Sequence, residues 1–196
     1  MVDRKFRGHP ACFVQLFQRV SLSISKKGNN MLALGIDPGT AICGYAVVNL
    51  AGNHLTPIHY GAVLTEKDML MELRLKKIYE ELTAIIEEYK PDFMSVEKLF
   101  FNTNVTTAIT VGQARGVIVL TAANKGIPVV EYTPIQIKQA VVGYGGATKQ
   151  QVTFMVQKLL NIRETPKPDD VADALATAIC GLHSIDKRKY GLELKR

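Results

Sequence analysis

Short runs of apolar residues and longer amphipathic stretches follow one another along the chain from residue 31 onward. Residues 31–36 form a continuous apolar run, residues 44–50 are rich in β-branched and aromatic side chains, and residues 54–64 alternate between apolar and polar positions. Gly52 and Asn53 mark a tight turn before the third of these runs. Three strands joined by short turns are therefore predicted, and they favour an antiparallel meander.

The rest of the chain alternates between the helical and the strand pattern. Residues 69–89 place apolar side chains at helical spacing between acids and lysines, and Pro91 ends that stretch. The later segments predict, in order, a buried strand at 93–96, a helix at 103–124, a strand at 128–132, and helices at 149–160 and 169–184. This order predicts an α/β fold with a mixed five-stranded sheet and helices on both faces.

Composition limits the class of protein. The 196 residues suit one domain, with 47% apolar and 21% charged residues, and no run approaches the ~18 apolar residues that a membrane span requires. The three cysteines are far apart and form no C-x-x-C pair, so neither a disulfide framework nor a zinc cage is expected. A soluble protein of the reducing cytoplasm fits these features best.

Positive charge is concentrated at the N-terminus. The net charge is +6, and residues 1–30 alone carry +5, so the remaining residues do not imply nucleic-acid binding by charge. We interpret residues 1–30 as a leader outside the fold, which is a mis-start, an added segment or a targeting segment. Residues 31–184 are expected to form the domain, and residues 185–196 a basic C-terminal tail.

Acidic residues stand where predicted elements begin or end. Asp37 directly follows the first strand in the sequence GIDPGT, and Glu97 follows the buried strand at 93–96 in the same way. Asp37 is otherwise a turn cap, and Glu97 otherwise a solvated side chain at a strand end.

A third group of acids opens the last predicted helix. Either Asp169 or Asp170 shares a helix face with Asp173, because residues three and four apart are neighbours on a helix. Asp169 also suits an N-cap after Pro168. Asp173, however, lies among small apolar residues, where an unpaired charge is costly and a metal ion would offset that cost. Together the four carboxylates predict a site for two Mg²⁺ ions about 4 Å apart, which is an arrangement found in nucleases.

Five segments carry a resemblance to a known family: GIDPGTAICGYAVV at 35–48, SVEKLFF at 95–101, GQARG at 112–116, TPIQIKQAVVGYGGATKQQV at 133–152 and DDVADALATAI at 169–179. In identity, order and spacing they resemble the RuvC family of Holliday-junction resolvases, from residue 31 to about residue 184. The resemblance implies an RNase H-like fold, a homodimer, and catalytic and metal-holding roles for Asp37, Glu97, Asp170 and Asp173. Asp169 is then an N-cap or a residue that supports the ligands.

By the same resemblance the protein is a crossover junction endodeoxyribonuclease of DNA recombination and repair. It makes paired symmetric nicks in four-way junctions and leaves 5′-phosphate and 3′-hydroxyl ends. Two Mg²⁺ ions per site are implied, with Mn²⁺ as a substitute. RuvA and RuvB, the branch-migration proteins, are the implied partners.

Other matched positions are expected to contact DNA. Lys138 and Lys149 correspond to lysines near the scissile phosphate, and Phe100 to an aromatic residue that contacts the unstacked junction centre. Gln113 and Arg115 are expected to bind phosphates or the neighbouring subunit. Considered one at a time, Lys138 and Lys149 are also interpreted as solvated surface residues, and Phe100 is also interpreted as a core residue. The helix at 103–124 is either the dimer contact or an ordinary core helix.

Two other functions remain open on the sequence. A non-catalytic junction-binding protein of the RNase H-like group would have lost acids, whereas all four positions are filled here. GIDPGT also resembles the first phosphate loop of actin-like nucleotide-binding proteins. Those folds need a second phosphate-binding strand pair and a much longer chain.

Overall fold

One mixed sheet organises the protein. The computed structural model describes residues 30–98, 105–186, 189–190 and 192. The five strands are β1 (Asn30–Asp37), β2 (Ile42–Ala51), β3 (His54–Leu64), β4 (Phe93–Glu97) and β5 (Val129–Tyr132), and they lie in the order β3-β2-β1-β4-β5. The β1–β2 and β2–β3 pairs are antiparallel, whereas β4 runs parallel to β1 and to β5. The predicted mixed sheet with an antiparallel meander is confirmed.

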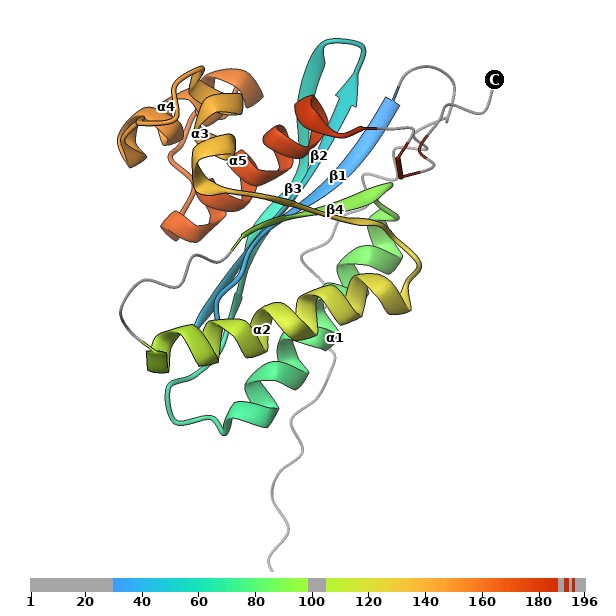
Figure 1. Cartoon of the computed structure of the whole chain (residues 1–196), viewed down its shortest axis with the longest axis vertical. Helices are drawn as coiled ribbons and strands as arrows, with labels where there is room; N and C mark the ends of the chain where they lie inside the picture. The colour runs from blue at the N-terminus through green and yellow to red at the C-terminus, as the bar shows by residue number, and fades with distance from the viewer. Residues whose placement is uncertain (1–29, 99–104, 187–188, 191, 193–196) are drawn as a thin grey trace, which may run out of the picture.

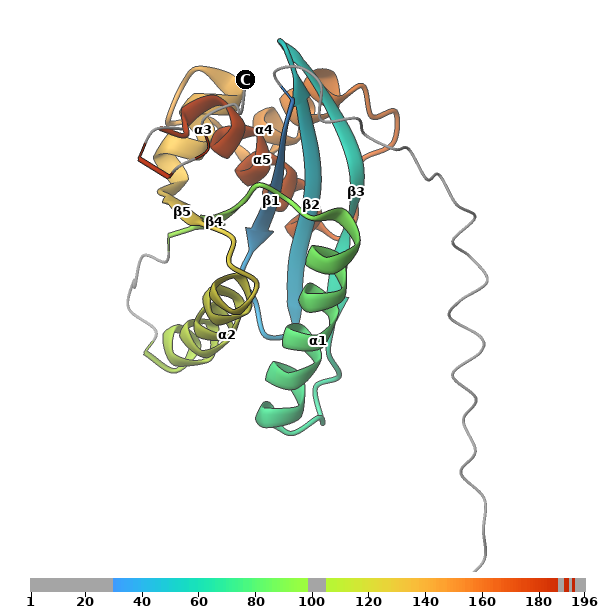
Figure 2. The same cartoon turned by 90° about the vertical axis from the view of Figure 1, so that its right-hand side faces the viewer.

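Helices cover both faces of this sheet, as predicted (Figure 1). One face carries α1 (Met71–Tyr89) and α2 (Val105–Asn124). The other carries α5 (Asp169–Ser184), which lies directly on β1 and β2, with α3 (Pro134–Val142) and α4 (Lys149–Leu160) packed outside it. Figure 2 shows the two helical layers from a second direction. The domain therefore has two separate cores, one on each side of the sheet.

Alternation along the strands assigns each side chain to one of the two cores. In β1, Ala33 belongs to the core under α5, whereas Leu34 and Ile36 belong to the core under α1 and α2. In β4, Phe93 faces α5 and Met94 faces the other way. Successive side chains of a strand point to opposite faces of a sheet, so odd-numbered positions of β1 and β4 point toward α5. The same alternation determines the direction of the acids at the ends of β1 and β4.

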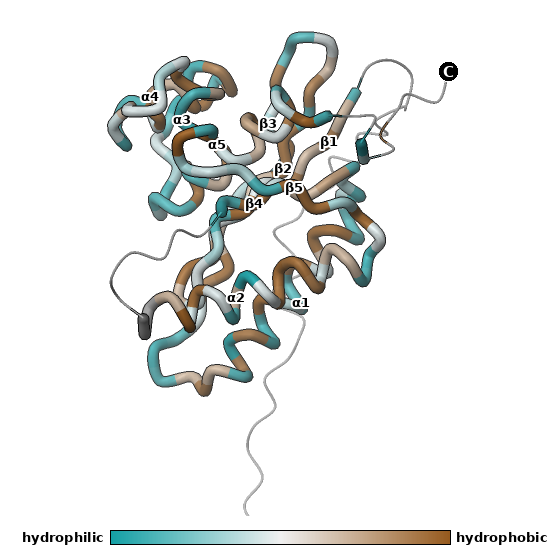
Figure 3. The backbone as a smooth tube through the Cα atoms, viewed as in Figure 1, coloured by the Kyte–Doolittle hydropathy of each residue, from teal (hydrophilic) through white to brown (hydrophobic). Residues whose placement is uncertain are grey.

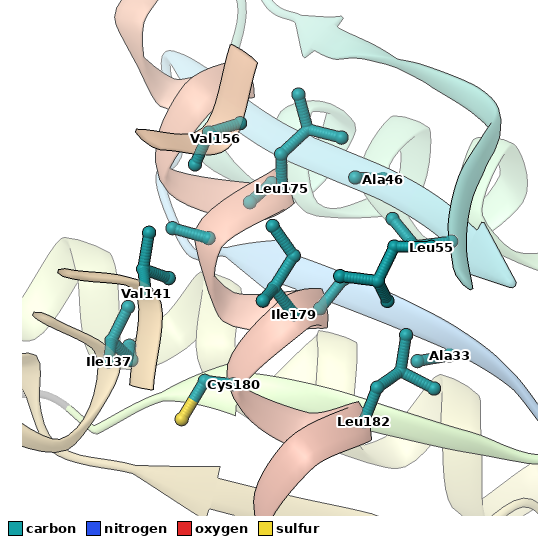
Figure 4. Packing of buried hydrophobic residues seen from close by; sticks show 14 of the residues in the cluster. Ala33, Ala46, Leu55, Ile137, Val141, Val156, Leu175, Ile179, Cys180 and Leu182 are labelled. Atoms are coloured by element: carbon teal, nitrogen blue, oxygen red, sulfur yellow. The ribbon is translucent and has the colours of Figure 1, made fainter. Parts of the chain in front are cut away.

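The helix α5 is apolar on nearly all sides because it lies between the sheet and two other helices. Residues 171–182 of α5 are buried, apart from a half-buried Asp173. Figure 4 shows Leu175, Ile179 and Leu182 of α5 between strand residues and the side chains of α3 and α4. In contrast, α1 has one apolar side, and Figure 3 shows hydrophilic and hydrophobic stretches alternating along it.

The observed elements differ from the predicted ones mainly at α3, which was not predicted. The nine-residue helix begins at Pro134 after the N-cap Thr133, whose hydroxyl accepts from the backbone N–H of Gln136 while the Gln136 side chain accepts from the N–H of Thr133. Proline in the first turn followed by glycine at the end is a recognisable helix signal. The helix is too short for a period of 3.6 residues to be recognised in the sequence.

Two further features bear on the remaining predictions. No helix among the described residues is long and apolar enough to cross a membrane. Beyond α5, Tyr190 and Leu192 pack against the core under α5, so part of the segment predicted as a basic tail contacts the domain.

Candidate active site

Two acids lie side by side at the ends of β1 and β4. These strands are parallel, and Ile36 pairs with Val96, so the next residues, Asp37 and Glu97, occupy neighbouring positions. Both follow by two residues a position that contacts α5: a Cβ on Gly35 would meet the backbone of α5, and Ser95 hydrogen-bonds to α5. Asp37 and Glu97 therefore point to the α5 side of the sheet.

Glycines in the sheet let α5 approach unusually closely. A Cβ built on Gly44, which pairs with Asp37 across β1 and β2, would lie 2.1 Å from the carbonyl oxygen of Asp170. A Cβ on Gly35 would lie 2.2 Å from the carbonyl oxygen of Ala174. No other residue type avoids these clashes, so the two glycines set how closely the first turns of α5 lie to the strand ends.

The first turns of α5 bring two more acids to the same place. Burial and the negative charges of Asp173, Glu97 and Asp170 raise the pKa of Asp37 from its usual range to about 7, against an opposing effect of Lys149. The charges of the other three carboxylates therefore all act on Asp37. The four acids that the sequence singled out come from three separate segments, and the fold gathers them at one end of the sheet.

Glu97 is perturbed in the same direction. Its burial and the charge of Asp173 raise its pKa, whereas Lys138 on α3 and Lys149 on α4 lower it. The site therefore contains excess negative charge that two lysines offset only in part. A carboxylate cluster of this kind favours the binding of cations.

Lys149 stands at the edge of the acid cluster. Its Nζ lies 3.1 Å from Oδ2 of Asp173 and 3.4 Å from Oδ2 of Asp169. Burial alone would lower the pKa of Lys149, but hydrogen bonds to Asp173 and Asp169 and their charges outweigh this effect and raise it. With half of its side chain exposed, Lys149 is reachable from solvent and in contact with the acids.

One prediction about Asp169 is wrong. The N-cap of α5 is Pro168, and Asp169 is the first helical residue, with no side-chain cap hydrogen bond. The Asp169 carboxylate instead contacts Lys149 and is largely exposed. The physical reason is that Pro168 already supplies the extended backbone of the cap, so Asp169 enters the helix, where its charge favours the positive end of the dipole.

Hydrogen bonds tie the strand of Glu97 to the helix of Asp173. The buried Ser95 hydroxyl donates to the carbonyl oxygen of Thr177 at 2.8 Å, and the Thr177 hydroxyl donates to the carbonyl oxygen of Asp173 at 2.8 Å. Both side chains are fully buried. Because a buried hydroxyl is costly without a partner, these bonds favour one position of α5 along β4.

The donor set fits a divalent metal ion. Carboxylate oxygens are the ligands that Mg²⁺ and Mn²⁺ prefer. Burial and the repulsion of the neighbouring acids raise the pKa of Asp37, and a bound cation would offset both effects. In the described residues no three acidic, histidine or cysteine side chains are already arranged as a metal cage. The site is a set of acids held near one another, with Lys149 as the neighbouring cation.

The residues predicted to bind DNA fall into separate places. Lys138 and Lys149 adjoin the acids, as their effects on the pKa of Glu97 indicate. Gln113 is exposed on α2, and the guanidinium of Arg115 on the same helix donates to the Glu131 carboxylate of β5. Phe100 lies outside the described residues. The DNA-binding roles of all five stay predictions.

The two interpretations of the helix at 103–124 each describe one of its sides. Ala114, Ile118 and Ala122 of α2 are buried in the core under α1 and α2. On the opposite side, an exposed stripe at helical spacing consists of Ile109, Gln113, Gly116 and Leu120. Ile109 is 57% and Leu120 55% exposed. One side is therefore core, and the other is an apolar surface without a partner among the described residues.

Gly35, Gly44 and Ser95 are contributors to the site that sequence reasoning missed. The available signal was a glycine inside a strand pattern, which often marks a close backbone approach. A small polar residue two positions before Glu97, in an otherwise apolar strand, was a second signal. Neither identifies the element that approaches, so only the fold assigns these residues to α5.

Comparisons with known proteins agree with this geometry. Residues 33–181 match the family described as crossover junction endodeoxyribonuclease RuvC. The chain is 60% identical over 150 residues to the crossover junction endodeoxyribonuclease RuvC of Desulforamulus reducens, covering 76% of this chain and 92% of that protein. It is also 60% identical to the RuvC of Heliobacterium modesticaldum, covering 79% of this chain and 96% of that protein.

A solved structure extends the similarity to the fold. Thermus thermophilus RuvC in complex with a Holliday junction substrate superimposes with a TM-score of 0.75 at 34% identity, covering 78% of this chain and 93% of that one. This match confirms the RNase H-like fold that the sequence resemblance implied. The acids at the strand ends and the close packing of α5 on two glycines accompany a family match over most of the chain. The chain belongs to the RuvC family of crossover junction endodeoxyribonucleases.

Proposed function

We propose that this protein is a Holliday-junction resolvase, a metal-dependent endonuclease that nicks two opposed strands of a four-way DNA junction. The observation that carries the proposal is the convergence of Asp37, Glu97, Asp170 and Asp173, where burial first and then the charges of the other three acids raise the pKa of Asp37 to about 7. Four clustered carboxylates are costly to fold, and a divalent cation offsets that cost. Two relatives that are 60% identical to this chain carry the same family description.

Each acid has a proposed role at the scissile phosphate. Asp37 and Glu97 from the strand ends, and Asp170 and Asp173 from α5, would hold two Mg²⁺ ions, for which Mn²⁺ substitutes. A metal pair supplies Lewis-acid charge, which makes a water nucleophilic and stabilises the leaving oxygen. Lys138 and Lys149, at the edge of the acids, neutralise the phosphate backbone beside the cut. Hydrolysis leaves 5′-phosphate and 3′-hydroxyl ends.

A second copy of the chain supplies the second site. The exposed stripe on α2 is apolar at Ile109 and Leu120, and its centre, Gly116, lets two helices approach closely. A two-fold dimer through this stripe would present two identical sites to two opposed DNA strands. Replacement of Leu120 by Arg is then expected to produce a monomer by analytical ultracentrifugation. Association with RuvA and RuvB stays a prediction of the family resemblance.

The experiment that tests this function compares two DNA substrates. The full chain is incubated with a labelled mobile four-way junction or a matching linear duplex, in Mg²⁺ or in EDTA. We expect paired, ligatable nicks in the junction only, and only with Mg²⁺. Binding without nicks would favour a non-catalytic junction-binding protein. The absence of both binding and nicks would contradict a role on junctions. A nucleotide-binding assay would then be the next experiment.

A further inference from the structure

The connection between β1 and β2 leads directly out of the acid site. Asp37 is the last residue of β1, residues 38–41 form the connection, and Ile42 begins β2. The connection is tight, because a Cβ built on Gly39 would lie 2.0 Å from the carbonyl oxygen of Ile42. A movement of so short a connection would therefore also move Asp37 and its ladder partner Gly44, which lies against α5.

Thr65, the residue after the end of β3, holds this connection at two points. Its backbone N–H donates to the carbonyl oxygen of Ala41 at 3.0 Å, and its hydroxyl donates to the carbonyl oxygen of Thr40 at 2.6 Å. Thr65 is buried, with 9% of its surface exposed, so water does not readily replace a bond that is lost there. Two of the four connecting residues are therefore held in place by Thr65.

Arg74, near the beginning of α1, donates to the same hydroxyl. Its Nε lies 2.8 Å from Oγ1 of Thr65. A hydroxyl has one proton, and Thr65 uses that proton on Thr40, so the Arg74 N–H is received on a lone pair of the oxygen. A hydrogen bond from a charged donor is stronger than one between neutral groups. The contact from Arg74 therefore holds the Thr65 hydroxyl in the orientation that faces Thr40.

Arg74 differs from the neighbouring cations of α1. Lys76 and Lys77 are each 3.6 Å from a glutamate one turn along, in exposed ion pairs of the kind that contribute little to stability. Arg74 is half-buried, and among the residues that the structure describes no carboxylate lies within 4.0 Å of it. Its guanidinium is directed instead at a neutral hydroxyl. Ion pairing along the helix therefore does not explain this residue, whereas support of the connection does.

We propose that Thr65 and Arg74 are positioning residues for the acid site. Arg74 orients the Thr65 hydroxyl, and Thr65 holds residues 38–41 so that Asp37 stays directed at the other three acids. The inference rests on the proposed function and extends the support of the site to the α1 side of the sheet. Both residues act through the connection, without a contact of their own to metal or DNA.

Three substitutions of Arg74 in the full chain separate its hydrogen bond from its charge. Arg74→Gln keeps a donor without the charge, because the amide nitrogen of glutamine stands at the place of Nε. Arg74→Lys keeps the charge but has a methylene at that place, and Arg74→Met has neither. Single-turnover cleavage at saturating protein is expected to be about 10-fold slower in Arg74→Met and Arg74→Lys, and near the native rate in Arg74→Gln. Recovery by lysine and not by glutamine, or native rates in all three variants, would overturn the proposal.

Two substitutions of Thr65 test the hydroxyl itself. Thr65→Val removes it at nearly constant shape and is expected to slow cleavage by about 10- to 100-fold, whereas Thr65→Ser keeps it and is expected to cleave at the native rate. Adding Arg74→Met to Thr65→Val is expected to cause no further loss, because Arg74 acts through the hydroxyl. Losses that multiply would show that Arg74 acts elsewhere. If Thr65→Val does not fold, the three Arg74 variants still give the answer.

A measurement without metal or DNA tests the positioning directly. Amide hydrogen exchange of residues 37–44 in the metal-free protein, followed by mass spectrometry, is expected to be about 10-fold faster in Arg74→Met and in Thr65→Val, and unchanged in Arg74→Gln. The matched control is Lys76→Met, which removes an exposed cation of the same helix and is expected to change neither exchange nor cleavage. Native exchange in Thr65→Val, or an equal increase in the control, would overturn the proposal.

The outcomes separate this inference from the function on which it rests. If the native chain does not nick the junction, the proposed function fails, and hydrogen exchange still shows whether Thr65 holds the connection. If the native chain nicks the junction and the Thr65 and Arg74 variants cleave equally well, only the positioning role fails. Junction binding in Ca²⁺ is expected to have the same affinity and salt slope in Arg74→Met as in the native chain. A slope reduced by about 1 would identify a direct phosphate contact and overturn the proposal.

Discussion

The two faces of the sheet are built from the same strands and differ in every property that matters for chemistry. The face under α1 and α2 is an ordinary apolar core, covered by helices whose lysines are neutralised by nearby glutamates. The face under α5 has two glycines, Gly35 and Gly44, where α5 lies closest to the strands, and it ends in acids. On its outer helices, Lys149 contacts Asp169 and Asp173, whereas Lys138 and Lys158 have no carboxylate within 4.0 Å among the described residues.

This difference teaches that close packing, and not only residue type, makes the site. Ile36 and Val96 point to the α1–α2 side and are fully buried, while the next residues, Asp37 and Glu97, point to α5. A shift of one residue in either strand would exchange these roles. The glycines on the α5 side then allow a helix bearing two further acids to lie within contact of the strands.

The largest effect is expected from removing a charge on the α5 side. Asp37→Asn should lower cleavage of the junction by more than about 100-fold, because a ligand of the metal pair is lost with little change in shape. Junction binding measured in Ca²⁺ should persist. The control is Asp68→Asn at an exposed position in the connection before α1, which should cleave normally. Equal loss of binding and folding in Asp37→Asn would contradict the metal-site interpretation.

The second largest effect is expected from changing Gly44, one of the two strand glycines that lie against the backbone of α5. Gly44→Ala should lower cleavage by about 100-fold, because displacing the first turn of α5 by about 1 Å misplaces Asp170 and Asp173. Gly61→Ala is the matched strand control, since its added Cβ would meet only the end of the Tyr45 side chain, at 2.8 Å from the hydroxyl. Metal affinity, measured as the rise in melting temperature with Mn²⁺, should fall in Gly44→Ala alone. We also combine Gly44→Ala with Asp170→Asn and measure metal affinity. If the two losses are additive, the substitutions act independently, and Gly44→Ala would then cause general damage and not misplace Asp170.

A moderate effect is expected on stability as a function of pH. The folded-state pKa of Asp37 is raised from 3.8 to about 7, so without metal the folded protein keeps a proton that the unfolded chain loses between about pH 4 and pH 7. The free energy of unfolding therefore falls across this window, and the loss is complete above pH 7. Asp37→Asn should melt at about the native temperature at pH 4 and about 2–8 °C higher at pH 8. A constant difference between the two pH values would contradict the raised pKa.

The smallest effect is expected on the α1–α2 face. Lys125→Gln breaks the contact with Glu87 in an exposed ion pair, and exposed ion pairs contribute little to stability. Cleavage should be unchanged, and chemical denaturation should show a small loss of stability. A marked loss of cleavage would mean that the two faces are coupled more strongly than their separate cores imply.

The element pattern could be predicted wherever a period was long enough to see. The bounds of β3, α4 and α5 agree with the residues at which alternation and helical spacing begin and end. The helix α3 could not be seen in its period because nine residues give little more than two turns, although its capping box was present in TPIQ. For Asp169 the local pattern suggested a cap, and the backbone of Pro168 already filled that position.

By itself, the sequence predicted the order of the elements except α3, and its resemblance to the RuvC family proposed Asp37, Glu97, Asp170 and Asp173 as the catalytic acids. Both predictions depend on local periodicity and on residues at fixed positions along the chain. Only the tertiary structure decided that Gly35 and Gly44 lie beneath the backbone of α5, that Lys149 contacts Asp173, and that α4 presents Phe154 beside Lys158. Each of these depends on how far apart two elements lie and how they are oriented. Long-range packing sets that distance, and no local pattern encodes it.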